Sequence, residues 1–174
     1  MYIIDVDDFH EDNQGMKYLK AFKNKFSNFK VNLFTIIGKC SPEFIKEIKD
    51  IDWIDMIPHG WMHDTSRECE DWSYEVSKAY LDRIGEFGLT KGFKAPGWQI
   101  SDGMYKALLE KGYWVADQDY NNFRRPKDLK CYLLDNPNKL HFHIQNVCGN
   151  GLEESFNKII NLKNNSFGFI KENI

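Results

Sequence analysis

Short apolar runs alternate along the chain with longer segments in which apolar residues recur every three or four positions. The short runs predict buried strands, and the wider spacing predicts helices with one buried face. Strands are expected at about residues 2–6, 31–37, 53–57, 92–95, 113–116, 140–147 and 167–170. Helices are expected between them, at about residues 16–26, 41–48, 73–84, 101–111 and 152–162.

Residues at the expected helix ends support these assignments. Ser41 and Pro42 place a capping hydroxyl and a proline in a first turn, and Ser101 is a second expected cap. Gly85 and Gly112 follow the last apolar positions of two helices, where they favour termination. The strand–helix units repeat over residues 1–174 without a linker, so the chain is expected to be a single α/β domain with parallel strands and outer helices, in a barrel or an open sheet.

Polar residues gather where the expected strands end. Asp7 and Asp8 follow the first strand, and the third, fourth and fifth strands are followed by His59, Lys94 and Asp117. In a barrel of parallel strands, the chemistry lies at the carboxyl ends of the strands. The sequence therefore predicts that these residues form one site.

Four of the five histidines stand in two close pairs, His59 with His63 and His141 with His143. The first pair is four residues apart at a strand end, so both rings can face one point. Two histidines and one carboxylate are a common ligand set for a catalytic divalent metal, because they leave coordination positions open. The second pair lies two residues apart and so faces one side of its strand, which is also compatible with an ordinary polar face.

Asp7 and Asp8 are adjacent, so on a regular strand they point to opposite faces. Both can reach one site only if the strand ends or bulges there. One carboxylate could then bind a metal while the other acts as a base. A surface turn is the alternative, although it fits poorly with a buried first strand.

Composition narrows the class of protein. Apolar residues make up 42% of the chain and charged residues 28%, and the net charge is −3 without a long basic run, so nucleic acid is not an expected partner. No apolar run is long enough to cross a membrane, and no signal peptide is expected. The four cysteines are scattered along the chain, at Cys40, Cys69, Cys131 and Cys148. We expect them to be reduced thiols in a cytoplasmic protein.

The acidic strand end, the first histidine pair and the Lys94 segment together resemble motifs of the polysaccharide deacetylase family, the NodB-homology domain of carbohydrate esterase family 4. The family motif Thr-Phe-Asp-Asp-Gly is similar to Asp5-Val6-Asp7-Asp8-Phe9, and His-Ser/Thr-x-x-His is similar to His59-Gly60-Trp61-Met62-His63. The motif Arg-x-Pro-Tyr/Phe is similar to Lys94-Ala95-Pro96-Gly97-Trp98. An acidic fourth motif resembles Asp117-Gln118-Asp119-Tyr120, and Leu-x-His resembles His141-Phe142-His143 after Leu140.

This resemblance implies a distorted (β/α) barrel of about seven parallel strands and removal of an acetyl group from an N-acetylated sugar. It implies that Asp8, His59 and His63 bind a divalent cation, with zinc expected. Asp7 would be the base, and His143 the acid that protonates the leaving amine, with His141 as the alternative.

The resemblance also suggests how a substrate is bound. A backbone N–H after Pro96, from Gly97 or Trp98, would bind the oxyanion. The expected substrate-binding residues are Pro96, Gly97, Trp98, Trp61, His141, Asp117 and Asp119. The two tryptophans could be platforms for sugar rings or could belong to the core, since aromatic residues make up 15% of the chain.

The sequence departs from the family pattern at several positions. Phe9 stands where the family has glycine, and Lys94 stands where it has arginine. Lys94 is expected to contact Asp7 through one donor, with Asp117 or Asp119 on its other side; the alternative is a solvated surface lysine. Another amide substrate, or a glycan-binding module without catalysis, remains an open alternative function.

Overall fold

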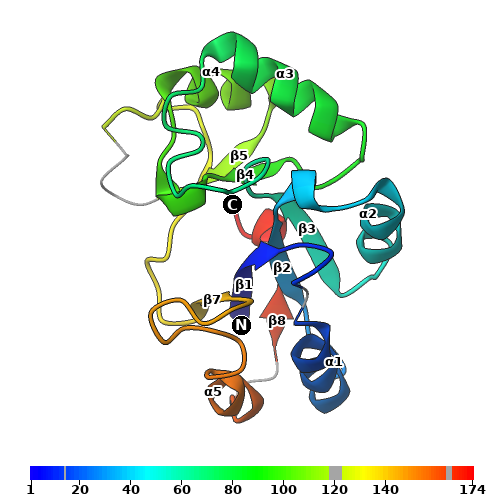
Figure 1. Cartoon of the computed structure of the whole chain (residues 1–174). Helices are drawn as coiled ribbons and strands as arrows, with labels where there is room; N and C mark the ends of the chain where they lie inside the picture. The colour runs from blue at the N-terminus through cyan, green and yellow to red at the C-terminus, as the bar shows by residue number, and fades with distance from the viewer. Residues whose placement is uncertain (14, 118–122, 164–165) are drawn as a thin grey trace.

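The structure is a computed structural model that describes residues 1–13, 15–117, 123–163 and 166–174. Within these ranges, short strands alternate with helices (Figure 1). The strands are β1 (Tyr2–Phe9), β2 (Val31–Thr35), β3 (Ile54–Pro58), β4 (Gly92–Lys94), β5 (Trp114–Ala116), β6 (Cys131–Tyr132), β7 (Lys139–His143) and β8 (Phe167–Gly168). The α-helices are α1 (Met16–Lys25), α2 (Pro42–Lys49), α3 (Tyr74–Gly85), α4 (Asp102–Lys111) and α5 (Phe156–Ile160).

The strands form two parallel sheets in the described part of the chain. The larger has the order β3-β2-β1-β7, with β8 also paired to β1, and the smaller has the order β4-β5-β6. β3 lies beside β4, but no ladder joins the two sheets within the described ranges. The predicted α/β fold with parallel strands is therefore confirmed, whereas a closed barrel of seven strands is not.

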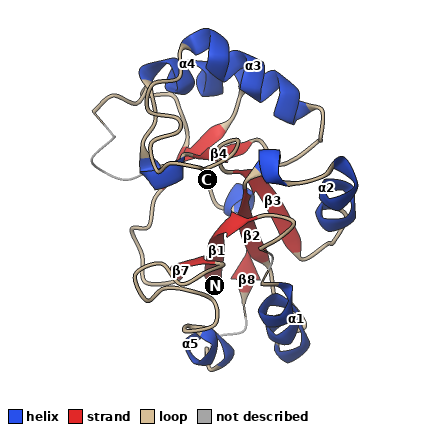
Figure 2. Cartoon of the chain, viewed as in Figure 1, coloured by secondary structure: helices blue, strands red, loops and turns tan. Residues whose placement is uncertain are grey.

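The helices lie outside the strands, as expected (Figure 2). The hydroxyl groups of Ser41, Ser73 and Ser101 each accept a hydrogen bond from the backbone N–H three residues further on, which satisfies a donor of the first helical turn. Gly112 ends α4 at a φ of 70°, a conformation that favours glycine. None of the described helices is both long and apolar enough to span a membrane.

Two expected elements are shorter than predicted, and one strand was not expected. The two-residue strand β6 was not predicted, because two residues are too few to show a period. The strand expected at residues 140–147 ends at His143, whose backbone groups bond to Asn150 and Leu152 across a turn. The helix expected at residues 152–162 covers only Phe156–Ile160, since turns precede it.

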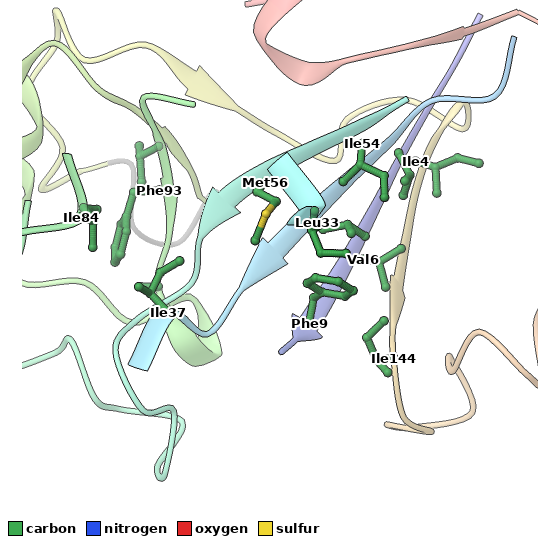
Figure 3. Close-up of a cluster of buried hydrophobic side chains, with 14 of the residues drawn as sticks. Ile4, Val6, Phe9, Leu33, Ile37, Ile54, Met56, Ile84, Phe93 and Ile144 are labelled. Atoms are coloured by element: carbon green, nitrogen blue, oxygen red, sulfur yellow. The ribbon is translucent and has the colours of Figure 1, made fainter. Parts of the chain in front are cut away.

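Alternation along β1 divides the core into two parts. Val6, Leu33 and Met56 are in register on β1, β2 and β3 and belong to the large cluster under the helices (Figure 3). A second, smaller cluster contains Ile3 on β1 and Tyr132 on β6. Because side chains two apart share a face of a strand, Asp5 and Asp7 follow Ile3 toward this second cluster. The fold thus brings two carboxylates into a buried region.

Candidate metal and catalytic site

The end of β1 is irregular. Such an irregularity is needed if two adjacent acids are to reach one site, because neighbouring residues of a regular strand face opposite sides. The register with β2 shifts between Val6 and Phe9, and Asp8 has a φ of 65°. This left-handed conformation is uncommon for a residue other than glycine and turns the Asp8 carboxylate toward the same cavity as Asp7. The predicted end or bulge of the strand is therefore confirmed, and a simple surface turn is wrong because both carboxylates are buried.

The first histidine pair lies where β3 ends. The buried His59 donates a hydrogen bond from Nδ1 to the Lys94 carbonyl oxygen (2.9 Å), which leaves Nε2 as the nitrogen available for a ligand bond. Nε2 of His59 is 3.7 Å from Asp8 Oδ1, and Nε2 of His63 is 3.3 Å from the same oxygen. His63 also has a left-handed backbone, with a φ of 51°. Strained residues of this kind often mark functional sites.

These separations fit a divalent metal. Asp8, His59 and His63 can each offer one metal-ligand atom, and these three atoms lie within 4.8 Å of one another. Two ligands about 2.0–2.2 Å from a tetrahedral zinc ion lie roughly 3.3–3.6 Å apart, which is close to the histidine–carboxylate distances here. The three expected ligands therefore have the chemistry and the spacing for one ion of this size.

Lys94 is buried and pairs with the carboxylate of Asp7. Its Nζ donates to Asp7 Oδ1 at 2.7 Å and lies 3.8 Å from Asp5 Oδ1. The ammonium also lies 4.0 Å from the centre of the Trp98 ring. The alternative of a solvated surface lysine is wrong, and the expected contact with Asp7 is present.

Asp117, the described acid of the fourth motif, is not the second partner of Lys94. Asp117 accepts a hydrogen bond from the Tyr105 hydroxyl at 2.9 Å and lies 3.6 Å from Arg125. Asp119 lies outside the described residues. Asp5, two residues before Asp7 on β1, stands near Lys94 instead. The strand that carries Asp7 and Asp8 thus also carries the second acid near Lys94.

Electrostatics in the site favour an ionised Asp7 carboxylate and a neutral His59 ring. Burial would raise the pKa of Asp7, but the charge of Lys94, together with His59 and His141, holds that pKa well below its ordinary value. Burial also tends to raise the pKa of Asp8, but the hydrogen bond from His143 outweighs it, and the pKa of Asp8 is lowered. Burial lowers the pKa of His59 to about 4, so its ring is neutral at neutral pH, as metal binding requires.

The second histidine pair faces the acids across the β1–β7 ladder, His141 opposite Asp5 and His143 opposite Asp7. His141 donates from Nδ1 to Asp5 at 2.6 Å, and His143 donates from Nδ1 to Asp8 Oδ2 at 3.0 Å. Both histidines with Asp7 could form a second ligand group. However, the Lys94 ammonium is 2.7 Å from Asp7 and 3.4 Å from His141, so its charge opposes a second cation there.

The third motif makes a tight turn at Pro96–Trp98. Gly97 and Trp98 both have left-handed backbones, and a side chain on Gly97 would collide with the Ser66 carbonyl oxygen. The N–H of Trp98 donates to the Ala95 carbonyl oxygen at 3.0 Å. The Trp98 N–H, one of the two expected to bind an oxyanion, is therefore hydrogen-bonded within the turn in this structure.

A cavity of about 450 Å³ opens over these groups, and its lining includes Asp7, Asp8, His59, His63, Trp98 and His143. Trp61 is not in this lining: it packs edge-on against Tyr80, with the Arg83 guanidinium 5.0 Å from its ring centre, and lines a different hollow. Of the two tryptophans expected as sugar platforms, only Trp98 borders the cavity. Pro96 is buried and is not part of this lining.

Three residues with contacts in the site were not among the predicted site residues. Asp5 could have been found from its spacing of two from Asp7, and Gln145 from its spacing of two from His143. Gln145 donates to Asp8 Oδ2 at 2.9 Å. Glu68 accepts hydrogen bonds from the histidine loop, and no motif or periodicity pointed to it.

Comparison with known proteins supports the fold. No protein-family model and no curated protein matches this sequence. The structure is similar to the carbohydrate esterase family 4 domain of a multidomain xylanase from the hindgut metagenome of Trinervitermes trinervoides. The TM-score is 0.62 at 14% identity, and the match covers 98% of this chain and 87% of that domain. It is also similar to a carbohydrate esterase family 4 pseudoenzyme from Bacillus anthracis, with a TM-score of 0.62, 12% identity and coverage of 99% and 64%.

The chain therefore has the α/β fold of carbohydrate esterase family 4 domains. These matches support the resemblance to polysaccharide deacetylases that the sequence motifs indicate. At this identity the likeness concerns the fold, and one of the two similar proteins is a pseudoenzyme.

Proposed function

We propose that this protein is a metal-dependent hydrolase that removes the acetyl group from an N-acetylated sugar. One observation carries the proposal: Asp8, His59 and His63 converge on one point, beside a buried Asp7 whose Oδ1 is paired with Lys94. A module that only binds glycans needs no buried base next to a metal site. The fold and the xylanase-associated domain support a carbohydrate substrate.

A divalent cation held by Asp8, His59 and His63, zinc in our proposal, would supply acidity to a bound water and polarise the acetamide carbonyl. Asp7 Oδ2 faces the same point, since it lies 3.7 Å from His59 Nε2, and takes the proton of the attacking water. Lys94 keeps Asp7 ionised and fixes its other oxygen. A backbone N–H of the turn after Pro96 is proposed to bind the oxyanion, as the family resemblance implies.

His143 is proposed as the acid that protonates the leaving amine. It lines the cavity, and its Nδ1 is held by Asp8, so Nε2 is the nitrogen left to carry the transferred proton. His141 has its Nδ1 bound by Asp5, with Nε2 3.8 Å from Asp7 Oδ2, so it belongs to the network that orders the base. Trp98, over Lys94, is the proposed platform for the sugar ring.

The first prediction compares these two histidines. His143→Ala should lower kcat by roughly 10²–10⁴-fold, the usual contribution of a positioned general acid. His141→Ala should lower it less, because the base and the metal ligands stay in place. Initial rates of acetate release at saturating substrate measure both. A larger loss in His141→Ala would transfer the acid role to His141.

The second prediction concerns Lys94→Met, which keeps the apolar stem and removes the charge. Without the ammonium, burial raises the pKa of Asp7, and the base becomes protonated at a higher pH. The acidic limb of the kcat/KM profile should therefore move to higher pH. Lys91→Met, at an exposed position three residues earlier, is the matched control. An active Lys94→Met enzyme with the wild-type profile would contradict this role.

Acetate release from a panel of N-acetylated oligosaccharides tests the proposal as a whole. We expect release by the zinc-loaded protein, loss of release after chelation, and recovery on adding zinc back. If the protein instead hydrolyses an amide that is not part of a sugar, the proposed metal site would stand but the proposed substrate would be wrong. Tight binding of the oligosaccharides without any release would instead show a glycan-binding module.

A further inference from the structure

The loop between the two metal-binding histidines is built around a carboxylate that lies outside the motifs. Glu68 accepts hydrogen bonds from three successive backbone N–H groups, those of Trp61 (3.0 Å), Met62 (2.8 Å) and His63 (3.1 Å). Successive N–H groups that point to one place form a concave site for an anion. Here the anion is part of the chain itself.

Glycine at position 60 makes room for this carboxylate. Gly60 has a φ of 68°, and a Cβ atom there would collide with Glu68 Oε2 and with Pro96 Cγ. The motif that this segment resembles has serine or threonine at this position. In this chain the space beside the backbone is filled by the side chain of Glu68, which approaches from eight residues further along.

Both Glu68 and the loop are fixed to the rest of the fold. Cys69, next to Glu68, is fully buried, and its carbonyl oxygen accepts a hydrogen bond from the Ser101 N–H at 3.1 Å. On the loop side, the buried Tyr80 hydroxyl donates to the Gly60 carbonyl oxygen at 2.9 Å. Glu68 thus links the histidine loop to a buried segment that is hydrogen-bonded to the start of α4.

The link matters most at His63. Its left-handed backbone costs free energy that its surroundings must offset. Hydrogen bonds from N–H groups to an ionised carboxylate are stronger than those between neutral groups. The hydrogen bond from the His63 N–H to Glu68 therefore holds the backbone in the conformation that brings His63 Nε2 to 3.3 Å from Asp8.

From these contacts we infer that Glu68 is a positioning residue for the metal site: it fixes the loop from Gly60 to His63 and thereby the place of the ligand His63. The inference rests on the proposed metal site for its effect on zinc. Its structural part, the order of the loop, does not depend on that proposal.

The test replaces Glu68 by glutamine, which has nearly the same shape. Glutamine offers one acceptor oxygen instead of two, and its NH₂ group would face a backbone N–H. Glu68→Gln should raise the zinc dissociation constant by about 10–100-fold, the usual effect of losing an outer partner of a ligand. Amide hydrogen exchange at Trp61, Met62 and His63 should become faster. Glu70→Gln, which removes a carboxylate paired with the exposed Arg67, is the matched control and should change neither.

Zinc affinity is measured by competition with a chromophoric chelator, and the melting temperature of the metal-free proteins checks that each variant is folded. If Glu68→Gln is folded and binds zinc as tightly as the wild type, the inference is wrong. If the wild type binds no zinc, the proposed metal site fails instead, and the exchange rates of the loop amides alone decide whether Glu68 orders the loop.

Discussion

Asp7→Asn should keep zinc and lose nearly all activity. The amide of asparagine cannot accept the proton of the attacking water, and a positioned base is worth roughly 10²–10⁴-fold in turnover. Asp8, His59 and His63 remain in place, so the zinc dissociation constant should stay close to that of the wild type. Asparagine Oδ1 can still accept the hydrogen bond of Lys94, which helps to keep the buried lysine partnered.

Two measurements on the same preparation check this separation, the rate of acetate release and the zinc affinity from chelator competition. Asp135→Asn, at an exposed carboxylate paired with Lys139, is a control for general effects of charge removal. Loss of zinc together with activity in Asp7→Asn would show that Asp7 is itself a ligand and that the roles of the two adjacent acids are wrongly divided.

Asp8→Ala should abolish tight zinc binding. It removes one of three protein ligands and also the acceptor of the hydrogen bonds from His143 and Gln145. The zinc dissociation constant should rise by more than about 100-fold, which exceeds the usual effect of an outer partner. Acetate release should fall to background and should not recover at moderate zinc concentrations.

Gln145→Ala is the comparison that isolates the ligand bond from its support. It removes one hydrogen bond to Asp8 Oδ2 but leaves all three ligands, so its effect on zinc affinity should be clearly smaller than that of Asp8→Ala. Equal effects in the two variants would mean that Asp8 acts through the hydrogen-bond network and not as a ligand.

Much of the fold follows from local patterns. Ser41 and Ser101 cap the helices that they were expected to start, and the longer strands lie where the apolar runs predict them. Long-range features are less accessible to sequence reasoning. Whether the sheet closes depends on how β3 meets β4, and neither strand carries a pattern that reports its neighbour.

The candidate site also has parts that local patterns predict and parts that they do not. The expected ligands Asp8, His59 and His63 do come together, because Asp8 lies near the carboxyl end of β1 and the two histidines lie in the segment that follows β3 in the same sheet. Of the two acids expected beside Lys94, Asp117 hydrogen bonds to Tyr105 instead, and Asp119 lies outside the described residues.

Glu68 could not be found from the sequence because its role depends on the path of the backbone. Its partners are three main-chain N–H groups, which are the same for every residue type except proline. By contrast, Asp5 shares a strand face with Asp7, so the period of two already contained the signal for it.

The most direct test of the central claim is where a metal binds. Crystals of the zinc-loaded protein, measured on both sides of the zinc absorption edge, should show one anomalous peak within bonding distance of Asp8, His59 and His63, and Asp7 should lie beside it with Lys94 still attached. A peak between Asp7, His141 and His143 instead, or no peak at Asp8, would contradict the account.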